Sequence, residues 1–240
     1  MDPNHYFVHF TSFNNKTDEE SLNNLLSILQ KGFLFSENEV APTLDENGEI
    51  FNLMNIEMVC FADITREYYL QHKAQYGQFG ICIDKNFIRK KGGQPVIYSD
   101  QYNKDSINNK ILKNLRDVTN YFATNNFDRD KNILKIMSSY YLFQAMTQPL
   151  ETKEENEWRV IDIETFDLFE KNEPKKSNQK YLTINDDSSV CFLIIPTKFK
   201  DELIKKVENP DKYENKTIFS ENFADCDYSN SIFNIYAPDK

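Results

Sequence analysis

The sequence predicts an α+β protein in which a pair of helices is inserted between two groups of strands. Short apolar runs typical of strands lie near both ends of the chain, for example YFVHF (6–10) and SVCFLII (189–195). From about residue 104 to 146, apolar residues instead recur at helical spacing. The 240 residues include only 6 glycines and 8 prolines and show no internal repeat, so we expect a single domain over 1–240.

The first helix is predicted from the residues at its two ends. Thr17 and Glu20 have the spacing of a capping box, and Gly32 supplies a left-handed stop. Between them, leucines at positions 22, 25, 26 and 29 form one apolar face. The sequence thus predicts a helix from Thr17 to Gly32, after the opening strand at 6–10.

The next part of the chain is predicted to be a loop and three strands. Segment 34–55 is polar and rich in turn residues, and loops of this length are usually functional or mobile. Strands are expected at 58–64, 79–84 and 94–99, with a short helix or turn at 65–78.

The inserted helices are predicted at about 104–123 and 128–146. The first carries Ile107, Ile111, Leu115, Val118 and Phe122 at helical spacing, and the second is apolar nearly all round, which predicts burial. The remaining elements are strands at 158–163, 180–184 and 189–195, a short helix at 197–207, and strands at 216–223 and 231–237.

Charge and cysteine usage restrict the partners and the compartment. The net charge of −10 opposes a stable grip on nucleic acid, and the one obvious contact for it is the basic stretch IRKKGG at 88–93. No signal peptide and no apolar run long enough to span a bilayer are evident, so no membrane partner is expected. The four cysteines show no C-x-x-C pairing, which favours a reducing cytoplasm, and three scattered histidines predict no metal site.

The stretch EENEWRV (154–160) is the most informative in the chain. In a strand, Glu155, Glu157 and Arg159 share one face, while Trp158 and Val160 take the other. These charges form either a solvated ion-pair ladder or part of a site. A carboxylate on a strand is held rigidly, which suits a site that stabilises positive charge.

Three other positions each allow a plain and a functional interpretation. His9 shares a strand face with Thr11, and is either a half-buried histidine bonded to a neighbour or part of a site. Tyr76 and Gly77 form either a tight strand entrance or an aromatic platform beside backbone that a ligand can approach. His72 is expected on a helix or loop surface.

The order of motifs resembles that of the AbiGi-like proteins of abortive phage-infection systems. The motifs are HFTSF…LLSILQKGF, MVCFADI, HKAQYGQFGICIDKNF…QPVIY and ENEWRV, and they cover most of the first 165 residues. This resemblance implies a phage-resistance component or an antitoxin.

A looser resemblance connects the opening H-x-T strand and its helix with DarT-like and other ADP-ribosyltransferases. It implies an ADP-ribosyltransferase-like mixed or antiparallel split sheet with flanking helices and NAD as the substrate. On this resemblance His9, Phe10 and Thr11 contact NAD, Tyr76 stacks on the nicotinamide, and Arg66 is the NAD-binding arginine.

The same resemblance implies Glu157 as the main catalytic group, with Glu155 before it and His9 opposite. Cleavage of the ribose–nicotinamide bond builds positive charge on the sugar, and a fixed carboxylate stabilises that charge. His9, Tyr76 and Glu157 are therefore expected to converge on one cleft.

Three functions remain open at this point. The first is a phage-defence enzyme that transfers ADP-ribose from NAD or hydrolyses NAD. The second is an antitoxin or sensor that binds a toxin or phage protein through its acidic surface. The third is a nucleic-acid-modifying enzyme that uses the basic stretch 88–93.

Overall fold

A computed structural model describes most of the chain and divides it into two compact units. The described residues are 6–12, 17–39, 43–44, 50–51, 55–63, 66–100, 105–124, 135, 138–139, 142–150, 153, 156–162, 179–184, 189–214 and 216–220. Unit 1 takes its residues from 1–34, 60–93 and 181–240, and unit 2 from 35–59 and 94–180.

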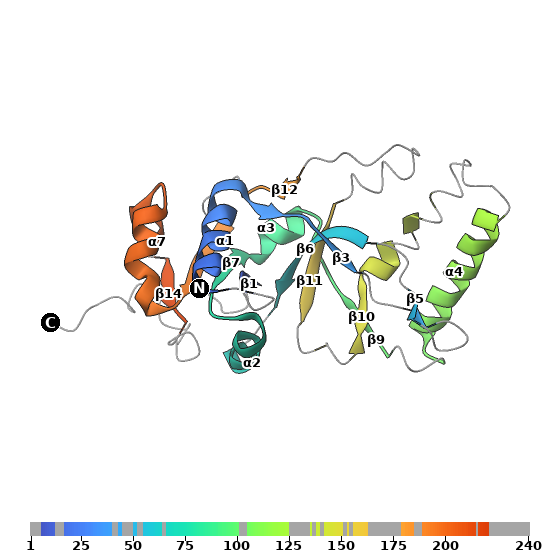
Figure 1. The fold of residues 1–240 in the computed structure, drawn as a ribbon. Coiled ribbons are helices and arrows are strands. Elements are labelled where there is room, and N and C mark those ends of the chain that lie inside the picture. Colours follow the sequence, from blue (N-terminus) through green and yellow to red (C-terminus); the bar gives the residue numbers. More distant parts are fainter. Residues whose placement is uncertain are drawn as a thin grey trace. The chain divides into compact units, whose positions relative to one another are not determined.

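Unit 1 contains both strands and helices (Figure 1). They are β1 (Tyr6–Phe10), α1 (Asp18–Lys31), β2 (Phe33–Leu34), the end of β6 (Asn55–Ala62), α2 (Arg66–Tyr76), β7 (Gly80–Asp84), α3 (Lys85–Lys90), β12 (Tyr181–Leu182), β13 (Val190–Ile195), the 3-10 turn Thr197–Phe199, α7 (Lys200–Lys206), α8 (Pro210–Glu214) and β14 (Thr217–Phe219).

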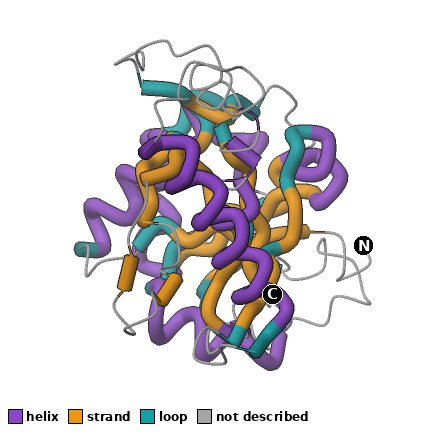
Figure 2. Tube along the Cα trace, turned by 90° about the vertical axis from the view of Figure 1, so that its right-hand side faces the viewer, coloured by secondary structure: helices purple, strands orange, loops and turns teal. Residues whose placement is uncertain are grey.

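The elements of unit 2 are mostly short strands, together with the long helix α4. Its elements are β3 (Ser36–Glu39), β4 (Thr43–Leu44), β5 (Ile50–Phe51), the start of β6, β8 (Gln94–Pro95), β9 (Ile97–Ser99), α4 (Ile107–Thr124), β10 (Thr147–Pro149) and β11 (Glu157–Ile161). Strands and helices thus both recur along the chain, as the predicted α+β class requires (Figure 2).

The sheet of unit 1 has the strand order β14-β13-β7-β1-β6. Its pairs are antiparallel except β13 with β14, so the sheet is mixed. Val8 lies opposite both Cys82 and Ala62, and these side chains join a core cluster with Tyr69 of α2 and Phe192 of β13. Helix α2 therefore covers the face of β1 that carries Val8.

Helix α1 covers the opposite face of β1. The hydroxyl of Thr11 donates to the carbonyl of Ser21 at 3.0 Å, and Asn24 donates to the carbonyl of Thr11 at 3.2 Å. The predicted capping box is confirmed, because Thr17 and Glu20 exchange both hydrogen bonds. The start of α1 is therefore predicted correctly from the sequence.

Gly32 ends α1, but not with the left-handed stop that the sequence predicts. Its φ of 95° is positive, whereas its ψ of −178° is extended. A Cβ at this position would lie 2.4 Å from the carbonyl oxygen of Leu182. Glycine is required here because the backbone of β12 comes close to it.

The predicted loop over 34–55 is wrong at its first half. Residues 36–39 form β3, which pairs antiparallel with β6 from Ser36 opposite Met58 to Glu39 opposite Asn55. The sequence does not predict this strand because SENE has no apolar side chain that would mark it. β6 accordingly begins at residue 55 rather than 58.

The predicted strand 94–99 is divided into two. β8 pairs antiparallel with β11, whereas β9 pairs in parallel with β10. Between them, the amide of Val96 donates to the carbonyl of Glu157 at 2.9 Å, and the amide of Ile97 donates to that of Met146 at 2.7 Å. The chain therefore changes pairing partners within two residues.

The first inserted helix is confirmed as α4, but its apolar face is not buried as a whole: Ile107, Ile111 and Val118 are 74%, 38% and 40% exposed. Within the second predicted helix, the described residues 135, 138–139 and 142–145 are helical. The predicted strand 231–237 lies outside the described residues. Among the helices that the structure describes, none has the length and apolar character needed to cross a bilayer.

Candidate functional site

Strand β11 carries the two charged side chains that the sequence singles out, and both are buried. Glu157 is 9% exposed and Arg159 is 4% exposed, on the same face of the strand. Trp158 is half-buried, and Glu155 lies outside the described residues. The two side chains share a face as predicted. Because both are buried, the interpretation as a solvated ion-pair ladder is wrong.

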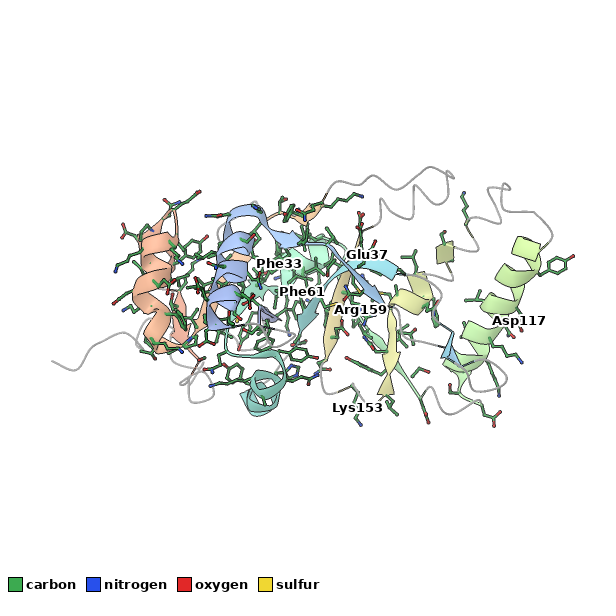
Figure 3. The ribbon with its side chains drawn as sticks, viewed as in Figure 1. Phe33, Glu37, Phe61, Asp117, Lys153 and Arg159 are labelled. Carbon is green, nitrogen blue, oxygen red and sulfur yellow. The ribbon has the colours of Figure 1, made fainter. Side chains whose placement is uncertain are left out.

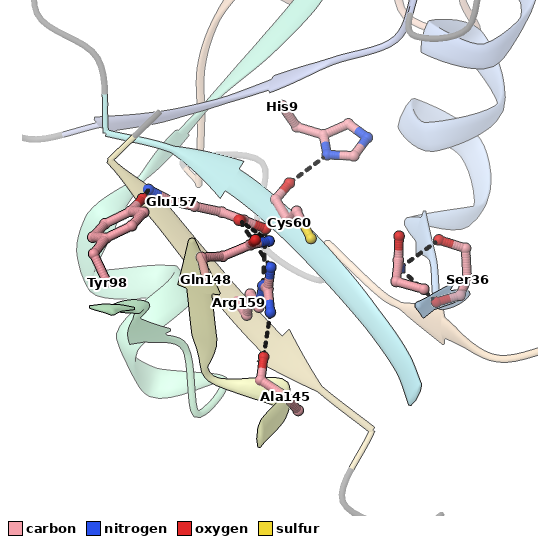
Figure 4. A network of polar contacts seen from close by, with 9 residues as sticks. His9, Ser36, Cys60, Tyr98, Ala145, Gln148, Glu157 and Arg159 are labelled. Carbon is pink, nitrogen blue, oxygen red and sulfur yellow. Dashed lines mark hydrogen bonds and ion pairs between the residues drawn. The ribbon is translucent and has the colours of Figure 1, made fainter. Parts of the chain in front are cut away.

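Glu157 and Arg159 form a two-point ion pair within unit 2 (Figure 4). The Nε of Arg159 donates to Oε1 of Glu157 at 2.9 Å, and Nη2 donates to Oε2 at 3.0 Å. The Nη1 donates to the carbonyl of Ala145, and the amide of Gln148 donates to Oε2 of Glu157 at 3.1 Å. Such a paired fork is the strongest arrangement that these two groups can adopt.

The backbone of Glu157 is also fixed. Its amide donates to the hydroxyl of Tyr98 at 2.7 Å. We call Tyr98, Ala145, Gln148, Glu157 and Arg159 the Glu157 network. It ties β9, β10 and β11 together, and the sequence gives no local signal for its three distant members.

The Glu157 network determines what the carboxylate can do chemically. Both of its oxygens accept hydrogen bonds from neighbouring side chains. A carboxylate has about four acceptor positions, so the three bonds leave little capacity for the ribose hydroxyl that a catalytic glutamate must contact. In this arrangement Glu157 serves as the counter-ion of a buried arginine.

His9 occupies the half-buried position of the plainer interpretation. Its Nδ1 lies 2.8 Å from the carbonyl oxygen of Cys60. Its ring packs on Phe33 and Phe61, with centroids 5.0 and 5.7 Å away, and these two phenylalanines also contact each other (Figure 3). Thr11, on the same face, is occupied by its bond to Ser21.

Phe10 and Tyr76 lie on the other face of β1. The ring of Phe10 stacks on Tyr69, His72 and Tyr76 of α2, with centroids 6.4, 6.1 and 5.9 Å away. His72 is 4% exposed, so its predicted surface position is wrong, because α2 turns this side chain toward Phe10. Tyr76 stacks within the protein's own aromatic cluster.

The structure does not bring the candidate residues together on one face. His9 and Tyr76 lie on opposite sides of β1, since successive strand residues point to opposite faces. Glu157 belongs to unit 2, and its convergence with His9 stays a prediction. Arg66 is the first residue of α2, and its side chain lies outside the described part.

Gly77 is explained by packing rather than by a ligand. Its φ is 86°, and a Cβ there would lie 2.2 Å from the Cβ of Ser12. The hydroxyl of Ser12 is buried, without a hydrogen-bond partner among the described atoms. The close approach that the sequence suggests is therefore made by Ser12.

Two thiols of unit 1, those of Cys82 and Cys191, are poor nucleophiles. Burial raises the pKa of Cys82 well above its usual range, and Cys191 adds to that rise. Burial and then Asp84 raise the pKa of Cys191 to about 11, although Lys216 lowers it. Both thiols are protonated at neutral pH, which excludes them as ready nucleophiles.

A cavity of about 230 Å³ lies beside α1 in unit 1 and contains none of the candidate residues. Its lining consists of Leu26, Leu29, Gln30, Val207, Glu208, Asn209 and Tyr213. Ligand pockets generally exceed about 300 Å³, so this cavity is small for a dinucleotide.

Comparison with known proteins finds one family. The model described as "Putative abortive phage resistance protein AbiGi, antitoxin" matches residues 34–208, which is most of the 240-residue chain. No curated protein and no solved structure matches the chain.

Proposed function

Because the chain belongs to the AbiGi family of abortive phage-resistance proteins, we propose that it is an antitoxin that binds a toxin protein and holds it inactive. The family description and the state of Glu157 both favour this function over NAD chemistry. The description names an antitoxin, and a neutralising protein needs a binding surface rather than a catalytic group.

The observation that carries the choice is the pairing of Glu157 with Arg159. Both carboxylate oxygens are used inside unit 2, and the arginine depends on them for charge balance. Turning this carboxylate away from Arg159 toward a ribose would leave a buried guanidinium without its counter-ion. The proposed role of Glu157 is therefore structural.

The charge of the protein supports binding to a basic partner. The net charge is −10, and exposed carboxylates occur in both units. An acidic surface steers a basic protein and speeds their association, more strongly at low salt. The exposed acidic side chains include Glu19, Glu20, Asp201 and Glu208 in unit 1 and Glu37, Asp105 and Asp117 in unit 2.

Neutralisation of growth arrest tests the proposal. Each gene flanking the one for this chain would be induced separately in a phage-sensitive host, with and without the chain. We expect one flanking product to arrest growth, the chain to restore growth, and the purified pair to co-elute. Failure of the chain to relieve any arrest would contradict the antitoxin function.

A labelled-NAD assay tests the enzymatic alternative, in which NAD remains the predicted substrate. The wild type, Glu157→Gln and Glu202→Gln would be compared, alone and in lysate. Glu202 pairs with Lys206 on the surface of α7 and serves as the matched control. The enzymatic function would be supported if the wild type and Glu202→Gln transfer the label and a correctly folded Glu157→Gln does not. The antitoxin function is supported if none of the three proteins consumes NAD.

A further inference from the structure

Helix α4 presents an apolar stripe to solvent. Ile107, Ile111, Val118 and Tyr121 are 74%, 38%, 40% and 61% exposed, and Asn114 between them is exposed as well. The five positions are separated by four, three, four and three residues, so they share one side of the helix. Leu115, off this stripe, is half-buried.

The spacing is that of a coiled-coil seam. Ile111 and Val118 take the a positions of a heptad, and Ile107, Asn114 and Tyr121 take the d positions. The apolar side chains can pack against a second helix, and a single polar residue in such a seam helps to fix its register at a cost in stability. The α4 seam, as we call these five residues, therefore fits one further helix.

The charged residues beside the α4 seam indicate that this further helix is α4 of a second copy of the chain. Lys110 and Asp117 occupy successive g positions and carry opposite charges. In an antiparallel pair of identical helices, g positions face g positions and a positions face d positions. Lys110 then faces Asp117 of the partner subunit, while Ile107 packs on Val118 of the partner subunit.

We propose that the α4 seam is a homodimer interface in which α4 of two copies packs antiparallel across a two-fold axis. Such an interface is isologous, so each favourable pair occurs twice. The two Asn114 side chains lie in adjacent layers on either side of the axis, within reach of each other. This dimer does not depend on the proposed antitoxin function.

A parallel pair of the same helices uses the charges less well. There g positions face e positions, so Lys110 meets Leu115 rather than a carboxylate. Lys110 also contacts Asp105 at 3.4 Å, but that pair is largely exposed and is worth little, so it does not oppose a new pair.

The dimer should be weak, since one helix from each copy makes a small interface. We expect a dissociation constant in the micromolar range, measured by sedimentation velocity from about 1 to 200 µM. Ile111→Lys and Val118→Lys should each weaken association at least tenfold, because they bury a charge in the seam. Leu150→Lys, at a 41% exposed apolar residue outside α4, is the control and should have no effect.

Charge reversal tests the pairing. Lys110→Asp and Asp117→Lys should each weaken the dimer several-fold, and the double variant should restore it. A monomer throughout the concentration range, or a dimer that Ile111→Lys and Val118→Lys leave intact, would overturn the proposal.

Cross-linking tests the direction. Mixing Ile107→Cys with Val118→Cys protein and oxidising should give a disulfide between the two variants, absent from parent protein treated alike. Disulfides within each variant alone would show parallel packing and contradict the antiparallel dimer.

Discussion

At Glu157 the carboxylate balances a buried guanidinium, and the stability of unit 2 should reveal this role. Glu157→Ala leaves Arg159 buried without its counter-ion, so we expect the free energy of unfolding to fall by about 3–5 kcal/mol. Glu202→Ala, which breaks the exposed pair with Lys206, should cost at most about 1 kcal/mol. Urea unfolding of the three proteins measures both differences.

A double variant distinguishes the contribution of the ion pair to the free energy of unfolding from the contribution of packing. Glu157→Met with Arg159→Met removes both charges at once, and its cost should be well below the sum of the two single costs. Additive costs would mean that the two side chains stabilise the unit independently.

The Glu157 network also shows how far a sequence predicts a site. The two-residue period of a strand puts Glu157 and Arg159 on one face, and this was predictable. Their burial was not, because it depends on Tyr98, Ala145 and Gln148, which lie 9 to 59 residues away from Glu157. Charged residues are rarely buried, so the sequence alone left a solvated ladder and a site equally open.

Cys191 should make stability depend on pH in the alkaline range. Its pKa is raised to about 11 from an ordinary value of 9.0, mainly by burial, so the folded state favours the neutral thiol. This stabilisation is complete below pH 9 and is lost as pH rises toward 11. The complete loss for a shift of this size is about 3 kcal/mol. Urea unfolding at pH 8 to 11 measures it, and Cys191→Ala should flatten the profile; an unchanged profile would contradict the assignment.

Among the elements, the end of α1 needs glycine at position 32 for two reasons, a positive φ and the close approach of a neighbouring backbone. Gly32 and Gly92 both have positive φ, of 95° and 84°. A Cβ at Gly32 meets the carbonyl of Leu182 at 2.4 Å, whereas a Cβ at Gly92 has nothing within 4 Å. Gly92→Ala should therefore cost only the backbone strain, about 1 kcal/mol.

Gly32→Ala should cost more, about 2–4 kcal/mol, because β12 must also move. Thermal unfolding of both variants makes the comparison. Equal losses would show that φ alone requires glycine at the end of α1.

The elements differ in how well the sequence predicts them, according to where their stabilising contacts lie. Helix α1 is predictable because Thr17 and Glu20 cap it from within its own first turn. β3 is not, since its polar side chains reveal nothing about its pairing with β6. β8 and β9 are separated because their partners, β11 and β10, lie some 50 or more residues further along the chain.

At the scale of the whole molecule, the two units are linked by the path of the chain. The backbone passes from one unit to the other after residues 34, 59, 93 and 180, so neither unit is a continuous segment. β6 belongs to both, with 55–59 in unit 2 and 60–62 in unit 1. Unfolding either unit therefore removes part of a strand that the other needs.

Trp158 makes this linkage measurable. It is the only tryptophan of the chain and lies in β11, so its fluorescence reports on unit 2, whereas far-ultraviolet circular dichroism reports on both units. Because β6 is shared, we expect the two urea transitions to coincide, as in two-state unfolding. Destabilising unit 1 with Gly32→Ala should then shift the fluorescence transition to lower urea as well. If the fluorescence transition stayed in place while the circular dichroism curve split in two, the units would unfold separately and the shared strand would not couple them.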